Sequence, residues 1–134
     1  MQKTIKAFTL IEVMVVVVIM AILAAIIVPP ILKRPDQARK VAAKQDILNI
    51  QSAMELYKLD NAQYPTQDQG ISALVTAPTS DPQPQNWQGP YLKNTPKDPW
   101  GQAYQYHNPG QHGDIDVSTI DNHQEEIGNW QSNR

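Results

Sequence analysis

The chain has 134 residues, with 11 basic and 13 acidic side chains, a net charge of −2 and no cysteine. The absence of cysteine excludes a disulfide framework, a thiolate metal site and a thiolate nucleophile. The slightly acidic balance argues against nucleic-acid binding, which needs a basic face. The 106 residues that follow the first 28 are enough for one small domain with a single core.

Residues 8–28 form an apolar run of 21 residues in which Glu12 is the only charged side chain. A helix of this length can cross the hydrocarbon core of a membrane. Lys3 and Lys6 precede the run and favour a cytoplasmic N-terminus, although the basic residues after it leave a reversed anchor open. A cleaved secretory signal is a further alternative, but Glu12 interrupts the apolar region that such a signal needs.

Glu12 lies where an ionised side chain is costly. A charge inside hydrocarbon costs at least ~2.5–3.5 kcal/mol on insertion scales. The sequence has no basic residue between Lys6 and Lys33, so the span itself supplies no cation for the carboxylate. We therefore expect the partner to come from another molecule or from a new chain terminus, which predicts assembly inside a membrane.

The residues after the apolar run predict a second helix. Pro29, Pro30 and Pro35 are expected to interrupt the first helix, because proline removes an amide donor and disfavours the preceding helical turn. Asp36 can then cap a helix that runs to about Asp60. Apolar residues recur within it at helical spacing and predict one buried face: Ala43, Ile47, Ile50, Met54 and Tyr57.

Prolines and glycines interrupt residues 61–113 throughout. A short helix is expected at 68–76, and alternating residues predict strands at 102–107 and 114–119. Trp87, Tyr91 and Trp100 indicate that the loops around them are ordered and packed on the core. The expected fold class is therefore α+β, with a helix laid on a small antiparallel sheet and long loops.

Several segments carry a family resemblance. The segment KAFTLIEVMVVVVIMAILAAIIVP at the N-terminus resembles the signature of type IV pilin-like proteins. Further segments narrow the resemblance to the major pseudopilins of bacterial type II secretion systems: ELYKLDNAQYPT (55–66), QGISALV (69–75), KDPWGQAYQY (97–106), NPGQHGDIDV (108–117) and IGNW (127–130). The resemblance covers nearly the whole chain.

The resemblance implies a pilin-like fold with a cleaved leader at 1–7, a transmembrane and assembly helix at 8–28 and a periplasmic domain at 29–134. A prepilin peptidase is expected to cut between Ala7 and Phe8 and to methylate the new Phe8 amine. That amine is then the cation that Glu12 of a neighbouring subunit pairs with in a filament. The family usually has glycine before the cut, where this chain has Ala7.

The implied function is that of a structural subunit that polymerises into the periplasmic pseudopilus and drives folded proteins across the outer membrane. The implied partners are further copies of the chain, minor pseudopilins, the prepilin peptidase, an inner-membrane assembly platform and an outer-membrane secretin. The implied location is the inner membrane, with one span and a periplasmic C-terminal domain. A type IV pilin, a minor pilin-like subunit and an unassembled periplasmic binding module are the alternatives.

The resemblance also implies a calcium loop near the C-terminus. Family members usually have an Asp-Gly turn and paired aspartates before the final tryptophan, whereas residues 118–130 here read STIDNHQEEIGNW. Asp121, Glu125 and Glu126 occupy the carboxylate positions, and calcium prefers oxygen ligands of this kind. Calcium binding and an acidic turn held by its own hydrogen bonds are both open for this shortened loop.

Catalysis is not expected. His107, His112 and His123 are spread along the C-terminal third without a metalloprotease, nucleophile-elbow or phosphate-loop motif around them. His112 lies within PGQHG, which is typical of a turn. The histidines are interpreted as surface or turn residues.

Overall fold

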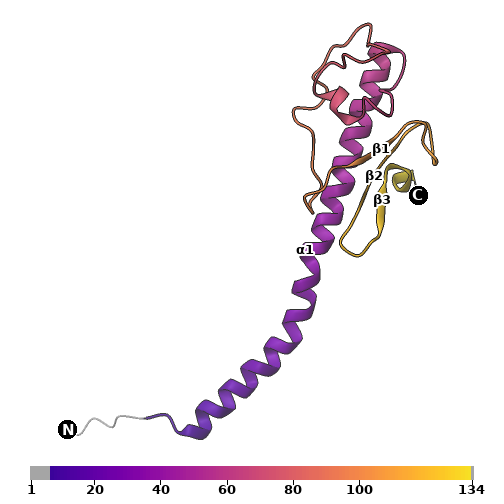
Figure 1. Ribbon diagram of the computed structural model, residues 1–134. Coiled ribbons are helices and arrows are strands. Elements are labelled where there is room, and N and C mark those ends of the chain that lie inside the picture. The colour runs from indigo at the N-terminus through magenta and orange to yellow at the C-terminus, as the bar shows by residue number, and fades with distance from the viewer. Residues whose placement is uncertain (1–6, 134) are drawn as a thin grey trace. The chain divides into compact units, whose positions relative to one another are not determined.

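The computed structural model describes residues 7–133. The chain divides into two compact units, the first ending at Gln37 and the second beginning at Ala38. Helix α1 spans Leu10–Asn61, and the other elements follow in the second unit (Figure 1). They are the 3₁₀ helix η1 (Ile71–Leu74), the strands β1 (Gln105–His107), β2 (Asp116–Ile120) and β3 (Glu126–Gly128), and the 3₁₀ helix η2 (Asn129–Asn133). The α+β class is confirmed.

The predicted interruption at Pro29 and Pro30 is wrong, because α1 continues through both prolines and through Pro35. Each proline removes one backbone donor, but its fixed φ is itself helical. The hydrogen bonds before and after these positions continue the helix. The helix expected from Asp36 to about Asp60 is therefore the C-terminal part of α1, which ends at Asn61.

Within the part of the chain that the structure describes, no helix is both long enough and apolar enough to cross a membrane. The span predicted over 8–28 reaches residues 27 and 28, whose side chains lie outside the described ones, and it stays a prediction. Residues 1–6 of the predicted leader also lie outside the described residues.

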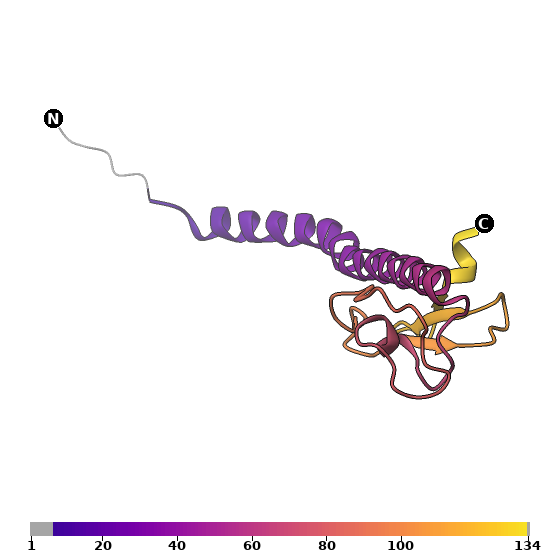
Figure 2. The same cartoon turned by 90° about the horizontal axis from the view of Figure 1, so that it is seen from above.

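The apolar face predicted for the second helix is confirmed. All five of its residues are buried, and they share one core with η1 and the sheet. Figure 2 shows the sheet and the loops against this part of α1. The other large side chains of this core are Ile71, Leu74, Tyr104, Tyr106, Ile115, Val117 and Ile127. Burial of this face holds the sheet and η1 on the C-terminal part of α1.

The sheet is antiparallel in the order β1-β2-β3. Tyr106 is opposite Val117, and Thr119 is opposite Ile127, so the central strand β2 is paired along both edges. The strands predicted at 102–107 and 114–119 are confirmed as the shorter β1 and β2. Sequence analysis missed β3, because its three residues are too few for alternation to be recognised.

Residues of the segments 55–66 and 69–75 hold the loops between α1 and the sheet. Asn61 accepts the amide of Asn86 at 2.9 Å, and the Tyr91 hydroxyl donates to Asp60 at 2.6 Å. The Trp87 indole donates to the Ala73 carbonyl at 2.9 Å. These contacts confirm an ordered, packed loop. The short helix expected at 68–76 is present as η1, which has four residues.

The KDPWG motif forms a turn around one buried carboxylate. Asp98 Oδ1 accepts the amides of Trp100 at 3.0 Å and Gln102 at 2.7 Å, and Asp98 Oδ2 accepts the Thr119 hydroxyl. Gly101 has φ +84°, a conformation that strains any other residue. Through Thr119, the turn is tied directly to β2.

Replacing Ile47 by alanine is expected to destabilise the second unit by about 2–5 kcal/mol, because the side chain is 1 % exposed and its loss leaves a cavity. Leu48→Ala, on the same helix but 38 % exposed, is the matched control and should cost much less. Denaturant unfolding of both variants checks this. Equal losses would contradict the assignment of the buried face.

Candidate functional site

The N-terminal part of α1 exposes apolar side chains all around the helix. Every side chain described between residues 7 and 26 is exposed, and most of them are large and apolar. They include Phe8, Leu10, Ile11, Val13, Met14, Val15, Val16, Val17, Val18, Ile19, Met20, Ile22, Leu23 and Ile26. A helix that is apolar on every side is stable only when other apolar groups cover it. This surface is therefore a candidate for contact with lipid or with other subunits.

Glu12 lies in the first turn of α1, where it makes a capping box with Thr9. The Thr9 amide donates to Glu12 Oε2 at 3.2 Å, and the Glu12 amide donates to Thr9 Oγ1 at 3.3 Å. The reciprocal bonds satisfy two amides that a helix start leaves without partners. Sequence analysis missed this role, although Thr-x-x-Glu before an apolar run is its signature. The Thr9 amide that binds the Glu12 carboxylate is neutral, so the negative charge of Glu12 can still pair with a cation.

The turn between β2 and β3 is built on Asp121. Its Oδ1 accepts the amides of His123 and Glu125, each at 2.8 Å. The Asp121 amide donates to the Glu125 carbonyl at 2.9 Å, which closes the turn. Gln124 has φ 65°, so the turn holds a non-glycine residue in the left-handed region. Asp121 therefore shapes the loop through hydrogen bonds to the protein's own backbone.

The Lys40 ammonium lies against two of the carboxylates that were predicted to bind calcium. Its Nζ is 3.1 Å from Asp121 Oδ2 and 2.7 Å from Glu125 Oε2. Hydrogen bonds to Glu125 and then to Asp121 raise the pKa of Lys40. Burial favours a higher pKa for Asp121, but the Glu125 amide, the Lys40 ammonium and the His123 amide together lower it. Both groups are therefore held in their charged forms.

The predicted calcium ligands do not fit a calcium site as they stand. Within residues 7–133, no three carboxylate, histidine or cysteine side chains form a group that could hold a metal, so Glu126 is not gathered with Asp121 and Glu125. Glu126 instead begins β3, opposite Ile120. Calcium binding stays a prediction, and an ion at these two carboxylates has to compete with the Lys40 ammonium.

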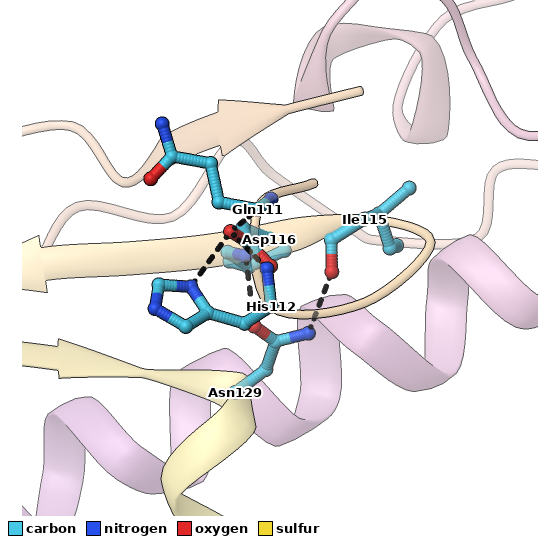
Figure 3. Close-up of polar contacts among 6 residues, drawn as sticks. Gln111, His112, Ile115, Asp116 and Asn129 are labelled. Carbon is cyan, nitrogen blue, oxygen red and sulfur yellow. Dashed lines mark hydrogen bonds and ion pairs between the residues drawn. The ribbon is translucent and has the colours of Figure 1, made fainter. Parts of the chain in front are cut away.

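A second carboxylate, Asp116, organises the PGQHG turn (Figure 3). Its Oδ2 accepts the Gln111 amide at 2.8 Å, the His112 amide at 3.2 Å and His112 Nδ1 at 3.0 Å. The His112 ring stacks on Trp130 with centroids 3.9 Å apart. The interpretation of His112 as a turn residue is confirmed, while His107 and His123 are exposed.

The IGNW motif, which runs from the end of β3 into η2, completes this network. Asn129 accepts the Val117 amide at 3.1 Å and donates to the Ile115 carbonyl at 3.1 Å (Figure 3). A side chain on Gly128 would collide with the Trp130 ring. At the other end, a Cβ on Gly110 would lie 2.6 Å from the Gly113 carbonyl oxygen. The glycines of both motifs therefore allow close approach.

The N-terminal methylation signature and the helix packed on a small antiparallel sheet define the class, a pilin-like subunit. A prokaryotic N-terminal methylation motif matches residues 2–28, and the model of type II secretion system protein G matches residues 30–133. The chain belongs to the family of type II secretion system protein G.

Named relatives support the same assignment. The chain is 49 % identical to the type II secretion system core protein G of Pseudomonas aeruginosa, over 92 % of this chain and 93 % of the relative. It is 50 % identical to the protein of the same name from Vibrio cholerae, over 92 % of this chain and 90 % of the relative. The crystal structure of the major pseudopilin from enterohaemorrhagic Escherichia coli superposes with a TM-score of 0.69 at 39 % identity, covering 78 % of this chain and 97 % of that one.

Asp116→Asn is expected to destabilise the second unit by about 2 kcal/mol at neutral pH, because hydrogen bonds to a charged group are the stronger ones. Burial opposes ionisation of Asp116, but the bonds from His112 and Gln111 outweigh it and lower its pKa. A lowered pKa gives stability that is complete above the unfolded value near 3.9 and is lost as the pH falls through the folded value.

The difference between wild type and Asp116→Asn should therefore shrink below about pH 4. Denaturant unfolding across the acid range measures it. A difference that stays constant down to pH 2 contradicts a role for the charge.

Proposed function

We propose that the chain is a structural subunit that polymerises into the periplasmic pseudopilus filament of a type II secretion system and so drives folded proteins across the outer membrane. The observation that carries this proposal is the exposed apolar surface around the N-terminal part of α1. In a filament, the apolar surfaces of neighbouring copies pack against one another and are buried. Lipid also covers this surface when a single copy stays anchored in a membrane. The charge of Glu12 therefore has to distinguish a filament subunit from an unassembled anchor.

The proposal places residues 8–28 in the inner membrane before assembly and the C-terminal domain in the periplasm. Cleavage between Ala7 and Phe8, with methylation of the new Phe8 amine, is part of the proposal, and the methylation motif over residues 2–28 supports it. Lys3 and Lys6 support a cytoplasmic leader, where the inner-membrane peptidase acts. The filament needs the inner-membrane assembly platform, minor pseudopilins and the outer-membrane secretin as partners.

Glu12 is proposed to pair with the Phe8 amine of the neighbouring subunit. The capping bond from Thr9 holds the Glu12 carboxylate at the helix start, four residues after Phe8 in its own chain. A carboxylate and an ammonium attract strongly where water is excluded, and either one alone is costly there. The pair therefore sets the axial register of subunits, while the apolar side chains supply the contact area.

A type IV pilin or a minor pilin-like subunit is the second candidate, since the N-terminal motif is common to these proteins. The match of the second unit to protein G of type II secretion favours the pseudopilus subunit. The protein supplies packing and register in this account, and no residue is assigned a catalytic role.

Glu12→Gln tests the proposed pairing. Glutamine retains an oxygen that can accept the Thr9 amide, so the variant removes the charge and keeps the cap. Filament yield should fall at least about tenfold, the change that ~1.4 kcal/mol per contact produces. Thr9→Val is the control, because it removes the hydroxyl that accepts the Glu12 amide and leaves the charge.

Sheared filaments from cells that produce each variant are quantified by immunoblotting, with membrane fractions as the loading control. The Thr9 variant should assemble to within a few-fold of wild type. The opposite order, with Glu12→Gln assembled and Thr9→Val not, would assign Glu12 to helix capping alone.

Ala7→Glu tests the processing site. The substitution puts a charge where the peptidase is expected to accept a small residue, so cleavage should be blocked. Ala7→Gly is the control and should be cleaved at least as well as wild type. Mass spectrometry of the membrane-bound protein gives the N-terminus. Assembled wild-type filaments that retain Met1 would refute the assignment of Phe8 as the first residue.

A further inference from the structure

The turn between β2 and β3 contains a buried negative charge that must be compensated. The Asp121 side chain is fully buried, while that of Lys40 is 32 % exposed and that of Glu125 is 67 % exposed. Asp121 Oδ1 has its two amide donors, whereas no backbone amide of the described residues donates to Oδ2. The group that lies at Oδ2 is the Lys40 ammonium, 3.1 Å away. A buried carboxylate oxygen without compensation is strongly destabilising.

Lys40 is placed for this contact by the fold of the second unit. It precedes the buried face of α1 by three residues, and it lies 85 positions from Glu125 in the sequence. The packing of α1 on the sheet brings the two segments together. Lys40 therefore ties the turn to the helix, and the contact exists only when the second unit is folded.

A divalent cation has the same electrostatic task in an acidic loop, but it needs a different environment. Calcium takes six to eight oxygen ligands at ~2.3–2.6 Å. Lys40 Nζ lies within 3.1 Å of an oxygen of both Asp121 and Glu125, so an ion bound to those oxygens would face a like charge at short range. The ammonium and the metal exclude one another.

We propose that the Lys40 ammonium is the resident cation of the turn at residues 121–125 and that the folded C-terminal loop needs no divalent metal. Lys40 compensates the buried Asp121 and also pairs with the more exposed Glu125. The amides of His123 and Glu125 complete the shell of Asp121 that a metal would otherwise share. This inference concerns the stability of the second unit and stands whether or not the chain forms filaments.

The test is thermal unfolding of the full-length protein in detergent, followed by near-ultraviolet circular dichroism in calcium and in chelator. The wild-type midpoint should be the same in both buffers. Lys40→Met keeps the length of the side chain and removes the charge, so it should lower the midpoint by at least about 4 °C in both buffers. Lys44→Met, at an exposed lysine one turn further along α1, is the matched control and should change it little.

Hydrogen exchange gives a local readout of the same contact. Lys40→Met should speed exchange of the His123 and Glu125 amides, which donate to Asp121, without changing that of the Tyr106 amide in β1. Lys40→Arg should retain most of their protection. Lys40→Met/Asp121→Asn should lose less than the sum of the single changes, because the two charges then disappear together.

Two results overturn the proposal. One is a wild-type midpoint that rises with calcium, since the loop then uses the metal; this outcome needs no variant to fold. The other is a Lys40→Met protein that unfolds and exchanges as wild type does, since the ammonium then compensates nothing. A Lys40→Met protein that does not fold at all supports the proposal only if Lys44→Met folds and the wild type ignores calcium.

Discussion

Helix α1 has apolar surface in both its N-terminal and its C-terminal part, and the two parts cover that surface differently. From Ala43 to Tyr57, one face is buried against η1 and the sheet of the same chain. Between residues 7 and 26, all the described side chains are exposed. Apolar burial contributes roughly 25 cal/mol per Å², so the exposed part represents a large free energy that only other molecules can supply. The N-terminal part of the helix is therefore suited to contact with lipid or with other subunits.

Charge decides what kind of assembly follows. Apolar contacts are non-directional, and a helix rich in valine and isoleucine can slide against a similar helix with little change in contact area. A carboxylate at one position removes that freedom, because only one register places it beside a cation. The capping bond to Thr9 also fixes where the Glu12 carboxylate lies on the helix. In the proposed filament, one polar residue thus converts a general attraction into a defined arrangement.

In the second unit, carboxylates likewise fix the local arrangement of the chain. Three carboxylates, Asp98, Asp116 and Asp121, each accept at least two backbone amides from a turn. Such bonds hold irregular segments that have no regular backbone pairing. A side chain adds a further partner to each of them: Thr119 to Asp98, His112 to Asp116 and Lys40 to Asp121. The long loops are therefore held by local polar contacts around buried anions.

Sequence alone predicted the features that depend on local pattern. The helical spacing from Ala43 to Tyr57 specified the buried face, and alternation specified β1 and β2. The capping box at Thr9 was readable in the same way and was overlooked. The continuity of α1 through Pro29 and Pro30 was not predictable from proline's preferences alone, because the surrounding helix outweighs the loss of two donors.

The contact of Lys40 with Asp121 lay beyond any local pattern. The two residues are far apart in the sequence, and only the packing of α1 on the sheet joins them. The family resemblance identified the carboxylates and implied calcium, which prefers oxygen ligands of this kind. The compensating cation was on another element. Charge balance within a site is a property of the fold, so it could not be assigned from the loop sequence.

Electron microscopy of the assembled protein tests the central claim most directly. The account predicts filaments in which residues 10–26 of many copies pack against one another at the centre, with the second units outside and Glu12 of one copy beside the first residue of the next. Filaments with the second units at the centre, or only single copies in the membrane of cells that contain the complete secretion system, would contradict it.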